Sequence, residues 1–187
     1  MHFKRVRLRA PAHLLAELDE FYREIDTGET ELEFVPGEGK PFYHFAFLAS
    51  PETFTGIGPA KEVFDFPAWD ARAIYYEDPA GNIVELIEHR GLPGPLGMSE
   101  LGLVGDTTAM ADGLRPLGLE LWDGTLDEPG RLAFFGERGR TLILSPETRG
   151  WMPTGRPAER HPLEAELSGI RPGSIELEAG LYRISGV

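Results

Sequence analysis

Three side chains in this sequence have the chemistry of metal ligands and fall within predicted strands. They are His44, Glu85 and Glu100. An imidazole nitrogen combined with carboxylate oxygens is a ligand set that suits Fe, Mn, Ni, Zn or Co. A glutamate beside such a site is also suited to move a proton. These residues are therefore the candidates for a metal site or for acid–base chemistry.

Glu85 is the most informative of the three because of its neighbours. Side chains alternate between the two faces of a strand, so Glu85 shares its face with Ile83 and Ile87. A carboxylate between two isoleucines on a core-facing strand is unfavourable unless it is paired or bound to a metal. His44 shares its face with Ala46, which also indicates an inward orientation.

Two structural explanations remain open beside the metal site. A single histidine on a strand is commonly a hydrogen-bonded core residue, and Glu85 is also a suitable partner for Arg5 or Arg7 across a barrel. The geometry separates these cases. If His44 and Glu85 bind one metal ion, their donor atoms must lie within roughly 3–4 Å of each other, because metal–ligand bonds are near 2.0–2.2 Å.

Composition and charge exclude several classes of protein. The 187 residues include 31 acidic and 18 basic side chains, for a net charge of −13, which is unlike a nucleic-acid-binding protein. There is no cysteine, so disulfides, thiol nucleophiles and cysteine metal sites are excluded. No apolar run is long enough to span a membrane, and the basic N-terminus alternates like a strand, so we expect a cytoplasmic protein.

The expected elements follow a repeated order of one strand, one helix and then two or three strands, starting near residues 3, 42 and 98. Helices are expected after Pro11 and after Asp106, which is a good N-cap residue. Residues 90–97 are the clearest linker, and 150–157 are expected to be a loop. Strands are expected at residues 3–9, 31–35, 42–48, 62–66, 71–77, 83–88, 99–104, 119–122, 131–135, 141–144, 163–167 and 174–184.

The segments 42–47 and 74–89 carry a resemblance to a known family. The second contains the hairpin Asp78-Pro79-Ala80-Gly81-Asn82 followed by Ile-Val-Glu-Leu. This pattern resembles a module of the vicinal oxygen chelate superfamily, which includes glyoxalase I, extradiol dioxygenases and the fosfomycin- and bleomycin-resistance proteins. The resemblance implies an α+β fold in which paired βαβββ modules form an incompletely closed barrel.

The resemblance also predicts how the modules divide the chain. Residues 1–37 form a short, truncated first module, and 42–90 form the second module, so that 1–90 is a unit of paired modules. Residues 98–187 form a third, additional module with C-terminal strands. The first module has room for only a turn between its helix and residue 31, so a strand or two is missing from it.

In metal-dependent members of this superfamily the ligands come from the first and last strands of paired modules. His44 matches the first-strand histidine and Glu85 matches the last-strand glutamate of the second module. Arg5 stands where many members place a ligand in the first module, so a third ligand is unassigned. Glu100 has the matching first-strand position in the third module, and either completes the site or serves a separate one.

Two classes of function follow from the resemblance. The first is a metal-dependent enzyme acting on a small oxygen-rich substrate, by isomerase, lyase or ring-cleavage dioxygenase chemistry, with Glu85 also as a catalytic residue. The cofactor is then a divalent ion whose identity stays open. The alternative is a metal-free protein of the bleomycin-resistance type that sequesters a small molecule. A small molecule is the expected partner in both cases, with a homodimer as a further option.

Overall fold

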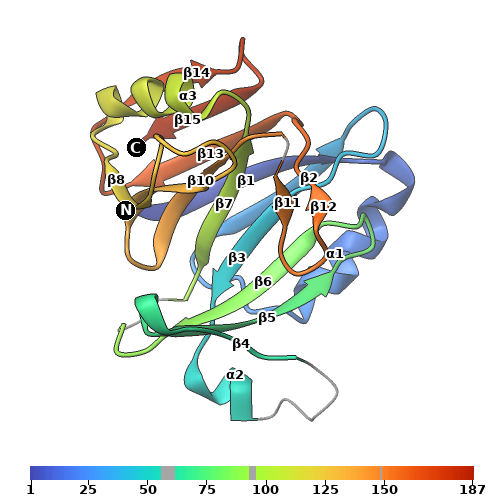
Figure 1. Cartoon of the computed structure of the whole chain (residues 1–187). Coiled ribbons are helices and arrows are strands. Elements are labelled where there is room, and N and C mark those ends of the chain that lie inside the picture. Colours follow the sequence, from blue (N-terminus) through green and yellow to red (C-terminus); the bar gives the residue numbers. More distant parts are fainter. Residues whose placement is uncertain (56–61, 93–95, 148) are drawn as a thin grey trace.

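The computed structural model describes residues 1–55, 62–92, 96–147 and 149–187, and within them the strands form two large sheets (Figure 1). The larger sheet has eight strands and the smaller has five. The two sheets pack face to face. The other face of the larger sheet carries a cleft. Mixed sheets with few helices confirm the α+β fold with an incompletely closed barrel.

The eight-stranded sheet consists of two similar halves. Its strand order is β4-β5-β6-β3-β7-β10-β9-β8. In each half the first strand runs parallel to the last, and the two first strands, β3 and β7, pair antiparallel at the centre. The bounds are β3 (His44–Leu48), β4 (Phe64–Phe66), β5 (Ala71–Glu77), β6 (Ile83–His89), β7 (Met98–Val104), β8 (Leu121–Gly124), β9 (Ala133–Glu137) and β10 (Arg140–Ser145).

The five-stranded sheet joins the two ends of the chain. Its order is β14-β15-β13-β1-β2, with β1 antiparallel to β13 and parallel to β2 (Figure 1). The first module therefore contributes only two strands here, as its short sequence predicts. The bounds are β1 (His2–Ala10), β2 (Glu31–Pro36), β13 (Leu163–Ser168), β14 (Gly173–Leu177) and β15 (Tyr182–Gly186).

The pairing of the modules differs from the expected one. We expected 1–37 to pair with 42–90, but β3 of the second module pairs with β7 of the third, and β1 pairs with the C-terminal strand β13. The physical reason is that a truncated module exposes too little sheet to cover a complete one. The two complete modules therefore share one sheet, and the two partial ones share the other.

The helices are short, and α1 packs against β2 while α3 packs against β14 and β10. Asp106 caps α3 as expected, because its side chain accepts hydrogen bonds from the backbone N–H groups of Thr108 and Ala109. The expected loop 150–157 contains a small hairpin, β11 (Gly150–Trp151) and β12 (Arg156–Pro157). The helices are α1 (Leu15–Arg23), α2 (Pro51–Thr55) and α3 (Thr107–Leu114), and the 3₁₀ turns are Ala12–Leu14, Pro67–Trp69 and Arg115–Leu117.

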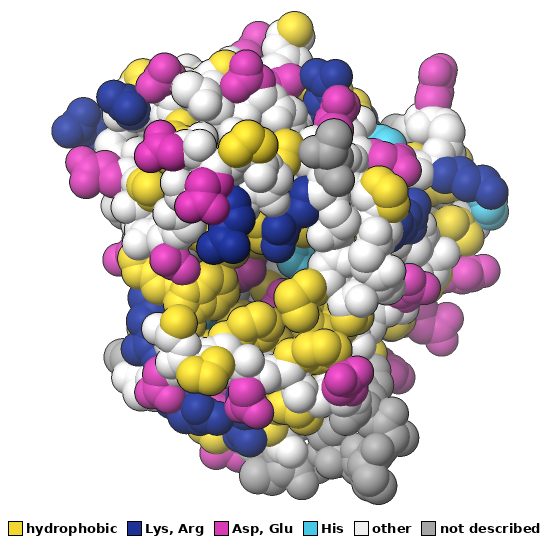
Figure 2. All heavy atoms as spheres, viewed as in Figure 1, with side chains coloured by type: hydrophobic (Ala, Val, Ile, Leu, Met, Phe, Trp, Pro, Cys, Tyr) yellow, Lys and Arg dark blue, Asp and Glu magenta, His cyan; other side chains and the backbone are white. Residues whose placement is uncertain are grey.

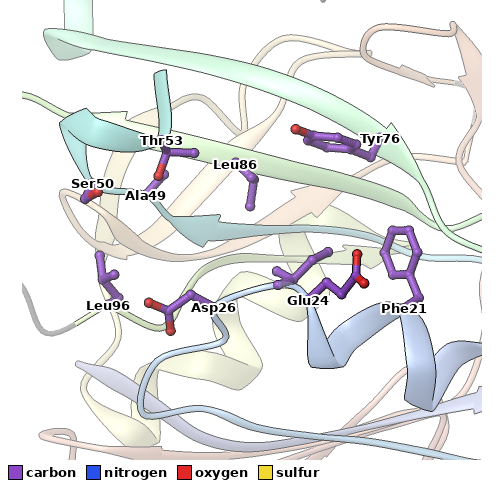
Figure 3. A pocket seen from close by; sticks show the side chains of 10 residues that line it. Phe21, Glu24, Asp26, Ala49, Ser50, Thr53, Tyr76, Leu86 and Leu96 are labelled. Carbon is purple, nitrogen blue, oxygen red and sulfur yellow. The ribbon is translucent and has the colours of Figure 1, made fainter. Parts of the chain in front are cut away.

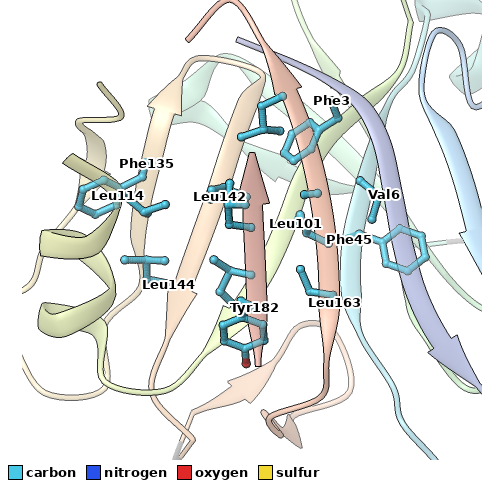
Figure 4. Close-up of a cluster of buried hydrophobic side chains, with 14 of the residues drawn as sticks. Phe3, Val6, Phe45, Leu101, Leu114, Phe135, Leu142, Leu144, Leu163 and Tyr182 are labelled. Carbon is cyan, nitrogen blue, oxygen red and sulfur yellow. The ribbon is translucent and has the colours of Figure 1, made fainter. Parts of the chain in front are cut away.

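The main core lies between the two sheets. Alternation along β1 turns Val6 and Leu8 inward, where they are fully buried, and Arg5 and Arg7 outward. Figure 4 shows the side chains that meet between the sheets. They include Val6, Phe45, Leu101, Leu142, Leu163 and Tyr182. The Tyr182 hydroxyl donates to the carbonyl of Val104 at 2.7 Å and so ties the smaller sheet to the larger one.

Most elements begin and end within two residues of their expected positions. The hairpin of β5 and β6 beside β3 is confirmed, with β5 antiparallel and β3 parallel to β6. Part of the expected linker, 93–95, lies outside the described residues. No helix in the described part of the chain is long and apolar enough to cross a membrane.

Candidate metal centre

His44, Glu85 and Glu100 come together on one face of the eight-stranded sheet. They belong to three adjacent strands, β3, β6 and β7. Ala46 lies opposite Glu85 on one side and opposite Glu100 on the other, so the two glutamates flank β3 in a single row. His44 is two residues from Ala46 and therefore points to the same face.

The distances and burial meet the requirement for common ligation. Each of the three residues offers one ligand atom, and these atoms all lie within 4.8 Å of one another. Nε2 of His44 is 3.6 Å from Oε2 of Glu85, as expected for two ligands of one ion. Both side chains are almost fully buried, at 6% and 4% exposure. Glu100 therefore lies in the same cluster and not in a separate one.

The ion pair between Glu85 and an arginine of the first module, which the sequence left open, is not formed. Arg5 binds Glu31 at 2.9 Å and Glu166 at 3.6 Å, and Arg7 binds Glu33, on the outer face of the smaller sheet. That face is separated from the cluster by the main core. Glu85 therefore has no cationic partner from β1.

Burial makes all three groups favour their uncharged forms. It lowers the pKa of His44 to about 4, so the imidazole is neutral and keeps a lone pair at neutral pH. Burial raises the pKa of Glu100 to about 8. Burial, and then the neighbouring Glu100, raise the pKa of Glu85 well above its ordinary value, while a hydrogen bond with Tyr75 opposes that rise.

The donor set fits a divalent cation. Two buried carboxylates and a neutral imidazole converge without any Lys or Arg within ion-pair distance among the described residues. Nδ1 of His44 is also buried without a hydrogen-bond partner in that part of the chain. A cation would stabilise the ionised carboxylates that burial otherwise disfavours, and this nitrogen–oxygen set suits Fe, Mn, Ni, Zn or Co.

The hairpin that carries the family resemblance positions this cluster. Oδ1 of Asp78 accepts hydrogen bonds from the N–H groups of Ala80 and Asn82, each at 2.9 Å. Oδ1 of Asn82 accepts the N–H of Tyr43 at 2.8 Å. Because Tyr43 precedes His44, the turn that begins β6 also holds the start of β3. The motif therefore sets the register between the strands that bear His44 and Glu85.

Aromatic side chains surround the cluster and form a small cleft of about 70 Å³. The ring of Trp151, from β11, stacks on His44 with 4.7 Å between ring centroids, and Tyr75 stacks at 6.4 Å. Figure 2 shows a hollow on this face, with hydrophobic side chains around it and Lys or Arg side chains along its upper edge. Other lining residues are Phe66, Trp69, Leu132, Phe134, Ile143, Arg149 and Met152.

Of the residues that line this cleft, the sequence analysis assigned only His44, Glu85 and Glu100 to the site, and Tyr75, Trp151 and Arg149 are among those that it did not assign. Tyr75 lies opposite Glu85 on β5, which its place in the hairpin register could have indicated. The segment with Trp151 was expected to be a loop, and nothing in the sequence singled out Arg149. Thr141 continues the row beyond Glu100, and its buried hydroxyl has no hydrogen-bond partner in the described part of the chain.

A larger cavity, of about 420 Å³, lies on the opposite face of β5 and β6 (Figure 3). Phe21, Tyr76 and Leu86 line it, and Glu24 and Asp26 are its only charged lining residues among those described. Tyr76 and Leu86 alternate with Tyr75 and Glu85, so this cavity is separated from the cluster by the sheet. Size alone therefore does not identify the site, and the converging donor atoms do.

Comparison with known proteins supports the fold. No family model matches the sequence, and no curated protein matches it. Among solved structures, a single-residue mutant of glyoxalase I from Zea mays is similar over 99% of this chain and 93% of its own, with a TM-score of 0.60 and 14% identity. A candidate dioxygenase from Bacillus subtilis is similar over 100% of this chain and 85% of its own, with a TM-score of 0.55 and 12% identity.

At these identities the likeness is one of fold. The predicted fold is thereby confirmed: the chain is similar in architecture to glyoxalase I. What the chain binds and which reaction it performs must be argued from its own residues.

Proposed function

We propose that this chain is a metal-dependent enzyme that acts on a small oxygen-rich substrate. His44, Glu85 and Glu100 would hold the metal ion. The observation that carries the proposal is the convergence of these three buried groups within 4.8 Å, without a cationic partner among the described residues. Buried carboxylates in such an arrangement are unfavourable unless they serve a bound ion or a reaction.

A divalent metal, when bound, would polarise vicinal oxygens of the substrate and stabilise a developing enolate or oxyanion. The protein groups do the remaining work. Neutral His44 would offer a lone pair, and the two glutamates, once ionised by metal binding, would offer negative charge. Trp151 covers His44 and keeps its ring in one orientation.

Glu85 is the candidate for proton transfer. Its pKa is raised in the metal-free protein, which favours the protonated carboxyl there, and binding of a metal would release that proton. Tyr75 contributes a hydrogen bond to the same side chain and orients it. An isomerase, a lyase and a ring-cleavage dioxygenase would all use a bound metal and a group that transfers protons. The cluster alone therefore does not determine the reaction type, which also depends on the substrate.

The test is element analysis of the purified protein by mass spectrometry. We expect about one equivalent of a transition metal, and a large loss of metal in both Glu85→Gln and Glu100→Gln. Glu77→Gln, at an exposed position on neighbouring β5, is the matched control and should keep the metal. A wild-type protein that neither contains a metal nor takes up added Zn²⁺, Mn²⁺ or Fe²⁺ would contradict the proposal and favour the metal-free binding protein.

A further inference from the structure

Arg149 lines the same cleft as His44 and has an unused hydrogen-bond donor. Its Nη1 donates to the carbonyl of Gly130 at 2.9 Å. Its Nε is buried and has no hydrogen-bond partner among the described residues. No carboxylate in that part of the chain lies within 4.0 Å of its guanidinium. Arg149 is also the one Lys or Arg among the described residues that line the cleft.

Other arginines of the described residues, such as Arg138 and Arg156, also bind backbone carbonyls and not carboxylates, but only Arg149 among them has a buried Nε without an acceptor. Acidic side chains outnumber basic ones by 31 to 18, and Arg5, Arg7 and Arg160 each bind two carboxylates. A buried N–H group that lacks an acceptor costs free energy in the free protein. A ligand that draws the guanidinium into the cleft, so that Nε gains an acceptor, removes that cost, and the cleft is therefore suited to an anionic group.

The surroundings of Arg149 indicate what such a ligand looks like. Apart from Arg149 and the cluster, the residues that line the cleft are mostly aromatic or aliphatic, including Tyr75, Phe134 and Trp151. The enclosed volume of about 70 Å³ is smaller than the roughly 150 Å³ cavity that takes a benzene ring. A compact, flat or apolar ligand would therefore be partly enclosed, and the rest of the ligand would lie in the open part of the cleft.

We propose that Arg149 binds a carboxylate of the substrate. The substrate class is then a small organic acid with vicinal oxygens at one end, toward His44, Glu85 and Glu100, and a carboxylate at the other. The inference rests on the proposed function for the orientation of the ligand. A single charge fits better than a phosphate dianion, because two buried acidic groups share the cleft and like charges repel.

The test compares two probes that differ only in the charged group. 3,4-Dihydroxybenzoate and 3,4-dihydroxybenzamide carry the same vicinal oxygens, and calorimetric titration of the Zn²⁺-loaded protein avoids oxidation of either. We expect the acid to bind about 10–100-fold more tightly than the amide, as for a hydrogen bond to a charged group. Arg149→Gln should abolish this preference while it leaves the Zn²⁺ content unchanged.

Two further variants keep the result interpretable. Arg131→Gln removes an exposed charge in the neighbouring loop and should retain the preference, which excludes a general electrostatic effect. Arg149→Lys keeps the charge and should retain part of the preference if Arg149→Gln proves to be unfolded by circular dichroism. Equal affinity of the wild-type protein for acid and amide, or a preference that survives in Arg149→Gln, would overturn the inference.

The outcomes also separate this inference from the proposed function. If the protein binds Zn²⁺ but does not prefer the acid, the role of Arg149 is rejected and the proposal of a metal-dependent enzyme is retained. A protein that binds no metal but prefers the acid, through Arg149, would reject the metal enzyme and retain the anion site.

Discussion

At the scale of single residues, a substitution at Glu85 distinguishes between two roles for this side chain: a metal ligand and one member of a structural ion pair. In the metal-free protein Glu85 is a buried acid near neutral His44 and Glu100. Replacing it with the isosteric Gln removes a buried ionisable group without leaving a cation unpaired. The same substitution in a true buried ion pair would cost about 3–5 kcal/mol.

We therefore expect Glu85→Gln to leave the free energy of unfolding of the chelator-treated protein unchanged or higher. Urea unfolding with and without metal measures this. The wild-type protein should gain stability from added metal, and the variant should gain little. A loss of several kcal/mol in the chelator-treated variant would show that Glu85 is paired with a cation after all.

Tyr75 is a positioning residue for Glu85. Its hydrogen bond favours the ionised carboxylate, which is the form that binds a metal. Tyr75→Phe should lower Zn²⁺ affinity about tenfold, the lower end of the effect of losing a hydrogen bond to a metal ligand. Competition with a chromophoric chelator measures it, and Tyr76→Phe on the opposite face is the control. Equal affinity in Tyr75→Phe and the wild type would remove Tyr75 from the site.

His89 makes stability depend on pH. Burial and then Arg138 lower its pKa to about 4, whereas an unfolded histidine has a pKa near 6.5. Between these values the unfolded chain binds a proton that the folded chain does not. The free energy of unfolding should therefore fall as the pH drops from about 6.5 to 4, by up to roughly 3 kcal/mol for this group.

His89→Phe tests this, because a phenyl ring suits the aromatic neighbours Trp69 and Trp122 and does not titrate. Urea unfolding of chelator-treated protein at pH 7 and pH 4.5 should show a smaller difference in the variant than in the wild type. Part of the difference should persist, because burial lowers the pKa of His44 in the same direction. An unchanged difference would mean that His89 does not contribute.

At the scale of elements, the turn Asp78–Asn82 connects the sequence motif to the site. Asn82 is fully buried, and its side chain both accepts from Tyr43 and donates to Asp78. Asn82→Ala leaves the N–H of Tyr43 and an oxygen of Asp78 without these partners. We expect a loss of about 2–4 kcal/mol, because each unsatisfied buried group costs about 1–3 kcal/mol.

Thermal or urea unfolding measures that loss, and metal affinity should fall with it because His44 follows Tyr43. Pro79→Ala in the same turn is the control, since Pro79 is exposed and should change stability by less than about 1 kcal/mol. If Asn82→Ala were as mild as the control, the turn would not hold β3 in place.

At the scale of the whole molecule, strand pairs link distant parts of the chain. β1 pairs with β13, and β3 pairs with β7, so both sheets cross the predicted boundary between 1–90 and 98–187. We expect one cooperative unfolding transition. Far-ultraviolet circular dichroism, which reports both sheets, and tryptophan fluorescence should give the same midpoint. The three tryptophans, Trp69, Trp122 and Trp151, all belong to the cores on the cleft side.

Separate fragments 1–90 and 98–187 provide the second measurement. Neither should fold alone, because each would expose the edge of a central strand and an uncovered apolar face. Two separate transitions, or a folded fragment 1–90, would instead support the division of the chain into two units that the sequence predicts.

The sequence by itself determined the local features of this protein. Alternation placed His44 and Glu85 inward, and the Asp78–Asn82 motif indicated the hairpin beside β3. These features depend on side-chain period and turn chemistry, which are properties of short segments. They predicted the fold and named His44, Glu85 and Glu100 as candidate ligands, but left open whether Glu100 joins the other two.

Only the tertiary structure decided which modules pair and what completes the cleft. Glu100 reaches the cluster because β7 pairs with β3, and Arg149 and Trp151 reach it because their segment folds back over the sheet. Local pattern determines which face a side chain takes, but not which strand becomes its neighbour. The neighbour depends on how whole sheets cover one another, and partners far apart in sequence leave no periodic signal.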